Sequence, residues 1–148
     1  MNDEYYLKAA LELAKKAEDC SEVPIGAVLV YNNEIIAEGW NTPISRKDPT
    51  AHAEINVLRQ ASNKLENYRL VDTTLYVTLE PCSMCVGAMI WARVKRLVFG
   101  AFDPKCGAVT SAIELIDSKK HNHRVEWQGG ILEKECSMIL KNFFSKKR

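Results

Sequence analysis

The sequence lacks any long apolar stretch and any strong excess of charge of one sign. It carries 20 Lys and Arg residues against 19 Asp and Glu, a net charge of +1, so the total charge gives no indication of a nucleic-acid partner. No apolar run approaches the roughly 18 residues that a membrane-spanning helix requires. The first residues, Met1 to Glu4, are polar and acidic, unlike a secretory signal peptide. These absences predict a cytoplasmic protein with no membrane partner.

Internal repeats, linkers and low-complexity segments are also missing. With 148 residues, 47% of them hydrophobic and 26% charged, the chain is expected to form a single domain over residues 1–148 with one substantial core. The five cysteines are an odd number, and Cys82 and Cys85 form a C-x-x-C pair. In a reducing compartment, this usage favours metal or redox chemistry over a disulfide framework.

Charge is unevenly distributed along the chain. Residues 1–74 hold 8 basic and 12 acidic side chains (8 − 12 = −4), whereas residues 75–148 hold 12 and 7 (12 − 7 = +5). The basic excess gathers in residues 119–124 and in the tail at residues 145–148. Local basic patches matter more for phosphate binding than total charge does, although a solvated face and a frayed tail explain the same pattern.

Hydrophobic periodicity predicts alternating helices and strands. The first elements are an amphipathic helix at 3–19, a hairpin of strands at 23–30 and 34–39 around a turn at Asn32-Asn33, and a loop at 41–50. Thr50 is expected to cap the next helix. The remaining elements are helices at 52–63, 81–92, around Ile113 and at 132–144, and strands at 74–79, 96–100 and 124–127. This order predicts an α/β protein, a three-layer α/β/α sandwich with a mixed five-stranded sheet.

Two short motifs carry the chemistry: TAHAEI at residues 50–55 and PCSMC at residues 81–85. Zinc is bound tetrahedrally by Cys sulfur and His nitrogen, and His52, Cys82 and Cys85 supply these atoms. Each of the three lies at the start of a predicted helix, where the helix dipole favours thiolates. Three protein ligands leave one position open for water, as in catalytic zinc sites.

Glu54 favours an open, catalytic site over the alternatives. Those alternatives are a closed structural zinc with Cys106 as fourth ligand, and a redox-active C-x-x-C of the thioredoxin type. By itself, Glu54 would be a first-turn glutamate stabilised by the helix dipole. Beside a P-C-x-x-C motif we interpret it as a proton carrier, because a carboxylate next to an activated water can take its proton and pass it on.

The pairing of H-x-E with P-C-x-x-C resembles the signature of the zinc-dependent nucleobase deaminases. The flanking segments resemble the bacterial tRNA-specific adenosine deaminases (TadA type) of the cytidine/deoxycytidylate deaminase superfamily, from about Leu7 to Phe144. They include EVPIGAVLV (22–30), DPTAHAEI (48–55), TLYVTLEPCSMC (74–85) and FGAFDPKCGA (99–108). The resemblance implies a cytidine deaminase-like fold, one Zn²⁺ per subunit, and zinc-dependent hydrolytic deamination of the wobble adenosine of a tRNA anticodon loop to inosine.

The resemblance also implies roles for single residues. His52, Cys82 and Cys85 would bind zinc, and Glu54 would carry protons to the adenine ring and to the departing ammonia. Substrate contacts are expected from Asn41, the backbone N–H of Ala53, Val28, Asp103, Lys105, His123 and Phe144. One of the pair Phe143 and Phe144 is expected in the core and the other near RNA. Cys106 is expected to be a small buried residue.

The resemblance further implies a homodimer that takes a tRNA anticodon stem-loop as its partner. Candidates for the dimer interface are Met84, Met89, Ile90 and Trp91. Two alternatives remain: a deaminase of a free nucleobase or nucleoside such as guanine or cytosine on the same scaffold, and a zinc-stabilised RNA-binding module or inactive subunit. The basic C-terminal half opposes the first alternative, and Glu54 opposes the second.

Overall fold

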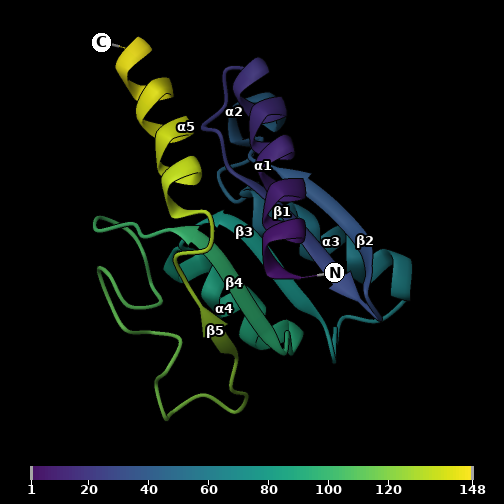
Figure 1. Cartoon of the computed structure of the whole chain (residues 1–148). Helices are drawn as coiled ribbons and strands as arrows, with labels where there is room; N and C mark the ends of the chain where they lie inside the picture. Colours follow the sequence, from purple (N-terminus) through teal and green to yellow (C-terminus); the bar gives the residue numbers. More distant parts are fainter. Residues whose placement is uncertain (1, 148) are drawn as a thin grey trace.

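A computed structural model describes residues 2–147, so that Arg148, the end of the predicted basic tail, lies outside the described residues. The helices are α1 (Asp3–Asp19), α2 (Pro43–Arg46), α3 (Ala53–Leu65), α4 (Ser83–Ala92) and α5 (Glu133–Lys146). The strands are β1 (Gly26–Tyr31), β2 (Glu34–Trp40), β3 (Thr74–Leu79), β4 (Arg96–Ala101) and β5 (Glu126–Gln128). Helices lie on both sides of the sheet, which confirms the predicted three-layer arrangement (Figure 1).

The sheet contains all five strands in the order β2-β1-β3-β4-β5. Strand β1 is antiparallel to both β2 and β3, whereas β3, β4 and β5 are mutually parallel. The hairpin between β1 and β2 turns at Asn32 and Asn33, whose φ angles of 51° and 63° are left-handed. Such a turn matches the right-handed twist of paired strands. The predicted hairpin and the mixed sheet are therefore confirmed.

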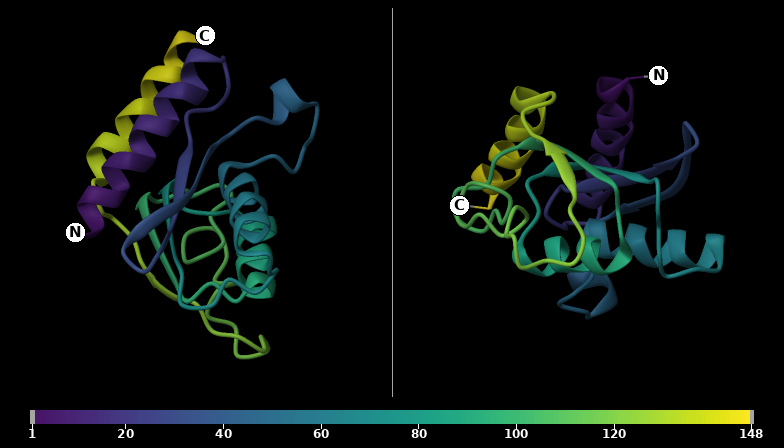
Figure 2. Two further views of the ribbon diagram at one scale, coloured as in Figure 1. Left: turned by 90° about the vertical axis from the view of Figure 1, so that its right-hand side faces the viewer. Right: turned by 90° about the horizontal axis from the view of Figure 1, so that it is seen from below.

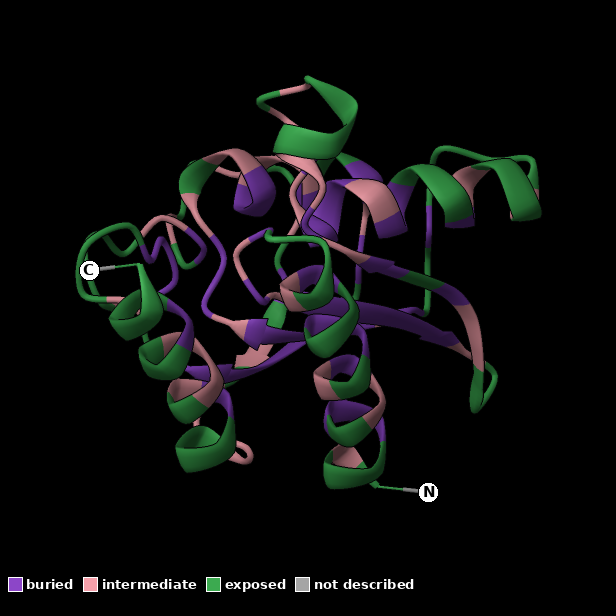
Figure 3. Cartoon of the chain, turned by 90° about the horizontal axis from the view of Figure 1, so that it is seen from above, coloured by how far each residue is buried: buried purple, intermediate pink, exposed green. Residues whose placement is uncertain are grey.

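Two apolar layers separate the sheet from its helices. Helices α1 and α5 cover one face, where Leu7 and Cys136 pack against Val28 and Val98. Helices α3 and α4 cover the other face, where Val57 and Met89 belong to the larger core cluster. Two turned views show the helices on opposite sides of the strands (Figure 2). The central strands β1, β3 and β4 are largely buried while the outward surfaces of α1 and α5 are exposed (Figure 3).

Several boundaries differ from the sequence prediction. The predicted loop at 41–50 contains the short helix α2, which begins at Pro43, a residue favoured at the first helical position. The helix predicted around Ile113 is wrong, because residues 102–125 contain turns but no helix or strand. Thr50 does not cap α3; its hydroxyl binds Asp48, and His52 occupies the N-cap position. Among residues 2–147, no helix combines the length and apolarity needed to cross a bilayer.

Candidate active site

Three potential metal ligands meet where two helices begin on the same side of the sheet. His52 is the N-cap residue of α3, Cys82 is the N-cap residue of α4, and Cys85 lies in the first turn of α4. All their ligand atoms lie within 4.8 Å of one another. The Nδ1 atom of His52 is 3.6 Å from the Sγ atoms of both Cys82 and Cys85. The fold thus brings together the three residues that the sequence singled out.

This spacing fits a tetrahedral metal ion. Zinc binds Cys sulfur at about 2.3 Å and His nitrogen at about 2.0–2.1 Å, so tetrahedral angles separate a nitrogen from a sulfur ligand by about 3.5 Å. The observed 3.6 Å agrees with that value for both sulfur atoms. Among residues 2–147 the group of close His, Cys, Asp and Glu ligands contains only these three. Cys106 is therefore not a fourth ligand, which leaves the closed structural site without support.

Hydrogen bonds among these three residues shift their pKa values. A hydrogen bond from Cys85 lowers the pKa of Cys82 to about 4, and His52 adds to this effect. The hydrogen bond with Cys82 raises the pKa of Cys85 above its usual range, and burial raises it further. The pKa of His52 is also raised, first by its hydrogen bond with Cys82. Binding a divalent cation here would displace these protons, since metal ligands must be deprotonated.

Glu54 is a buried carboxyl group in the first turn of α3. It lines the same cavity as His52 and Cys82. Burial raises the pKa of Glu54 to about 7, with the neighbouring Cys82 thiolate contributing in the same direction. A carboxyl group that titrates near neutral pH can both accept and release a proton during one reaction cycle. Glu54 thus lies in the same cavity as two of the candidate metal ligands and has a raised pKa.

The cavity in front of these residues has a volume of about 830 Å³. One wall comes from the ends of the central strands and the segment that follows β4, including Leu79, Phe102 and Asp103. Another comes from α5, including Leu140 and Phe144. The basic side chains that line it are Lys105, Lys141 and Lys147. Glu54, Glu80 and Asp103 are the acidic residues that line it, so the cavity suits a polar substrate whose phosphate groups could meet the three lysines.

Asn41 lines the cavity, and its amide is held in one orientation. Its Oδ1 atom accepts the backbone N–H of Ala53 at 2.9 Å. The Ala53 N–H is therefore already used within the protein, and the Nδ2 amide hydrogens of Asn41 are the donors left for a ligand. Both groups were expected, from the sequence, to contact the base separately. The structure instead joins them, with Ala53 orienting Asn41.

The other predicted substrate contacts divide into two groups. Asp103, Lys105 and Phe144 all line the cavity. Val28 does not; it is fully buried in the core cluster below α1. His123 does not either, because its ring nitrogen binds the Val94 carbonyl at 2.7 Å beside a separate cavity of about 230 Å³. Val28 and His123 therefore lie outside this cavity, and their contact with a substrate stays a prediction.

Several residues that line the cavity were not predicted from the sequence. Lys141 gives no distinguishing signal, because a lysine on an amphipathic helix is usually solvated. Cys106 was expected to be buried, but it is exposed and lines the cavity. Glu80 also lines the cavity while remaining buried. Its position after an apolar strand was a usable signal, since a charged residue that continues a buried strand needs a specific partner.

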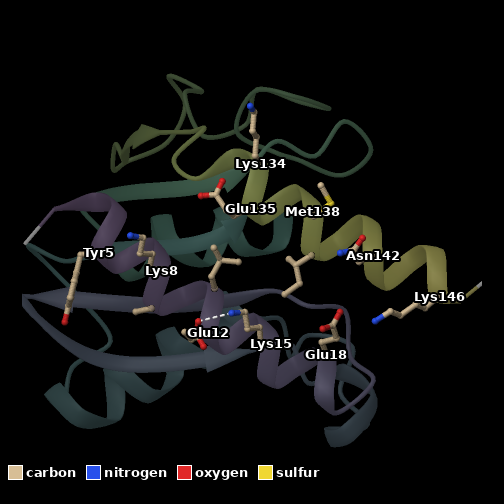
Figure 4. Close-up of a pocket in the computed structure, with 13 residues that line it drawn as sticks. Tyr5, Lys8, Glu12, Lys15, Glu18, Lys134, Glu135, Met138, Asn142 and Lys146 are labelled. Carbon is tan, nitrogen blue, oxygen red and sulfur yellow. Dashed lines mark hydrogen bonds and ion pairs between the residues drawn. The ribbon is translucent and has the colours of Figure 1, made fainter.

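A second groove lies between α1 and α5, on the other side of the sheet from α3 and α4 (Figure 4). Its volume is about 920 Å³. Lysines and glutamates alternate along it, including the Lys15–Glu12 ion pair at 3.0 Å. The groove therefore carries side chains of both charges. The His and Cys group that could bind a metal lies at the first cavity instead.

Comparisons with known proteins point the same way as the geometry. A family model for MafB19-like deaminases matches residues 1–148. A tRNA-specific adenosine deaminase of Haemophilus influenzae is 54% identical over 147 residues, or 99% of this chain and 85% of that protein. A solved structure from studies of A-to-I editing by tRNA:A34 deaminases has a TM-score of 0.89 at 43% identity, over 92% of this chain and 99% of that one. A guanine deaminase from Bacillus subtilis has a TM-score of 0.66 at 44% identity, over 69% of this chain and 66% of that one.

Proposed function

The chain belongs to the family of tRNA-specific adenosine deaminases, and on this basis we propose that it converts the wobble adenosine of a tRNA anticodon loop to inosine by zinc-dependent hydrolysis. The observation that carries the proposal is the position of Glu54 beside three metal-ligating atoms in one cavity. A structural zinc site has no use for a buried proton carrier. The family relationship supports the substrate, and the site supports the chemistry.

Four residues of this chain would carry out the proposed reaction. His52, Cys82 and Cys85 would hold one Zn²⁺ per subunit, and the bound ion would supply a Lewis acid that activates a water molecule at neutral pH. Glu54 would take one proton from the attacking water and deliver it to the purine ring, and it would then carry a second proton, from the hydroxyl group formed by that water, to the departing ammonia.

Binding of the base would depend on Asn41. The adenine must leave its stack to enter the cavity, which is easiest in a single-stranded loop. Since Ala53 holds the Asn41 oxygen, the Asn41 amide hydrogens are available to an acceptor nitrogen of the purine. Asp103 would contact ribose, and Lys105, Lys141 and Lys147 would meet phosphates near the cavity mouth. Phe144 is half exposed and would stack on a neighbouring base.

We further propose that two chains associate through the outer surface of α3 and α4. Trp91 is 72% exposed there, and a groove of about 490 Å³ next to it is lined by Ile55, Leu58 and Tyr68. Large exposed aromatic side chains beside an apolar groove are typical of interfaces. Of the other interface candidates, Met89 and Ile90 are buried in the core and Met84 is only partly buried against it.

The alternative is a deaminase of a free base, which the partial similarity to a guanine deaminase keeps open. The test is to incubate zinc-loaded protein with an anticodon stem-loop bearing a wobble adenosine, alongside free adenosine and free guanine, and to measure products by mass. Inosine formed only in the RNA is the expected result. Turnover of guanine but not RNA would establish the alternative, and inactivity on every substrate would favour a binding module.

A further inference from the structure

Glu80 is a buried carboxylate between β3 and the first metal-binding cysteine. Its side chain is 2% exposed, and its backbone N–H is bound to the Ala101 carbonyl at 2.8 Å. Among residues 2–147 it has no Lys or Arg within ion-pair distance. A buried carboxylate without a cation must be stabilised by hydrogen bonds, because desolvation otherwise disfavours the charge.

Those hydrogen bonds all come from one loop, residues 103–111, which we call the clamped loop. The Oε1 atom of Glu80 accepts from the Asp103 backbone N–H at 3.0 Å and from the Ser111 hydroxyl. The Oε2 atom accepts from the backbone N–H groups of Val109, Thr110 and Ser111 at 3.1, 2.9 and 3.0 Å. The carboxylate thus binds both ends of the loop.

The clamped loop is wrapped closely around the carboxylate. A Cβ atom at Gly107 would overlap the carboxyl group of Glu80, so no larger residue fits there. The Ala108 backbone N–H also binds the Pro81 carbonyl at 2.8 Å, directly before Cys82. Since the loop has no regular strand or helix of its own, these contacts substitute for a hydrogen-bonded ladder.

The loop also forms the part of the cavity that faces the proposed RNA. Asp103, Lys105 and Cys106 line the cavity together with Cys82, which follows Glu80 by two residues. We propose that Glu80 is a positioning residue that holds the clamped loop in register with the metal-binding end of α4 and thereby sets the affinity for RNA. The RNA part of this inference rests on the proposed function, whereas the clamping part does not.

Glu80→Gln tests the clamp with almost no change in shape. Its amide oxygen can keep the three N–H groups of Val109, Thr110 and Ser111, but its amide nitrogen then faces the N–H of Asp103, donor against donor. The Ser111 hydroxyl can reverse its role and accept. The variant should therefore release mainly the Asp103 end of the loop.

Hydrogen–deuterium exchange of the zinc-loaded protein measures this release directly. In Glu80→Gln we expect amides at the start of the clamped loop to exchange about tenfold faster, the size of one charge-assisted hydrogen bond. Amides of α3 and α4 and the zinc content should be unchanged. Glu22→Gln is the matched control, because Glu22 is also buried and accepts from Ile44 and Ser45 of α2. It should loosen α2 and leave the clamped loop unchanged.

The second measurement is kinetic. If Glu80 positions the RNA-facing loop, Glu80→Gln should raise KM for the anticodon stem-loop about tenfold while kcat stays within about twofold. Unchanged exchange in the clamped loop, or a fall in kcat with KM constant, would overturn the proposal. If wild type makes no inosine in RNA, the proposed function fails while the exchange result still decides the clamp. Should Glu80→Gln not fold, Ser111→Ala removes one bond, and unaltered exchange in that variant would also overturn it.

Discussion

The side-chain oxygen of Asn41 accepts the backbone N–H of Ala53, and this hydrogen bond ties the residue after β2 to the first residue of α3. Ala53 lies between His52 and Glu54, so the bond joins the proposed base-binding amide to the proposed metal ligand and proton carrier. Its direction matters because it turns the oxygen toward the protein and leaves both amide hydrogens of Asn41 free for a ligand. We therefore expect the site to favour a ligand that presents an acceptor at this point.

Replacing Asn41 tests that selectivity. Asn41→Asp keeps an acceptor for the Ala53 N–H but removes both amide donors, whereas Asn41→Ala removes donors and acceptor together. We expect kcat/KM on the anticodon stem-loop to fall at least tenfold in both variants, as for loss of one specific hydrogen bond. Only Asn41→Ala should leave the Ala53 N–H without its side-chain partner. Wild-type kcat/KM in Asn41→Asp would contradict the role of Asn41 as a donor.

Glu54→Ala separates proton transfer from metal binding. The substitution removes the carrier and leaves the three ligands in place, so turnover should fall by a factor of about 10² to 10⁴. Zinc content, measured by atomic absorption, should stay at one ion per chain. Cys82→Ser provides the comparison, because it removes a ligand and should reduce both zinc content and turnover. Loss of zinc from Glu54→Ala would mean that Glu54 acts mainly in holding the metal.

The carboxylate of Asp3 at the start of α1 binds both terminal nitrogens of Arg96 in β4 at 2.8 Å, and the Tyr76 hydroxyl donates to it as well. The Arg96 hydrogen bond lowers the pKa of Asp3 below its ordinary value, despite an opposing effect of burial. A carboxyl group with a lowered folded-state pKa adds stability above its unfolded-state pKa and loses it as the pH falls through the folded value.

Asp3→Asn should therefore lower the free energy of unfolding at pH 7 by about 1 kcal/mol, the upper end for a partly exposed pair. The difference from wild type should shrink as the pH falls below about 4, the unfolded-state pKa of Asp. Urea denaturation at several pH values measures both effects. Glu12→Gln is the control, since its pair with Lys15 is highly exposed and its loss should change stability by less than about 0.5 kcal/mol. A pH-independent difference for Asp3→Asn would argue against the ion pair as its cause.

The association of two chains is tested at Trp91, the exposed aromatic residue on α4. Trp91→Glu places a charge beside the groove of α3 and α4, and it should convert a dimer to a monomer in sedimentation equilibrium. Met138→Glu is the matched control, because Met138 is also an exposed apolar residue but lies on α5, across the sheet. A wild-type mass equal to that of one chain, or dissociation by both variants, would contradict an interface at α3 and α4.

The three candidate metal ligands could be predicted from sequence because each belongs to a short motif at the start of a helix. His52, Cys82 and Cys85 occupy helix starts, and a helix start constrains where a side chain points. The β1 strand allowed no such inference. Its residues from Gly26 to Val30 are all buried, so the apolar run does not reveal which face holds Val28. Without alternation of polar and apolar residues, a pocket wall and a core residue look the same.

The conformation of the loop at residues 102–125 could not be predicted from the sequence, for a different reason. Its conformation is set by long-range contacts, such as the bonds to Glu80 from residues 23 to 31 positions away. Local propensity contains no information about such partners. His123 shows the consequence, since its binding to the Val94 carbonyl holds it away from the cavity.

The two phenylalanines at the end of α5 provide the last prediction, because the structure divides them as expected. Phe143 is 7% exposed and Phe144 is 49% exposed and lines the cavity. Phe143→Ala should reduce the free energy of unfolding by about 2–3 kcal/mol, since it removes a buried aromatic ring. Phe144→Ala should leave stability nearly unchanged but weaken binding of the anticodon stem-loop about tenfold, the value of one stacked base.

Fluorescence anisotropy with labelled RNA and catalytically inactive Glu54→Ala protein as background measures that binding without turnover. Each phenylalanine serves as the control for the other, because both substitutions remove the same atoms from neighbouring positions on one helix. If Phe144 stacks on a base, its substitution should weaken RNA binding at every salt concentration while leaving the salt dependence unchanged, since no phosphate contact is lost. A steeper or shallower salt dependence would instead indicate that the lysines of α5 had moved, and that Phe144 acts by holding the helix end.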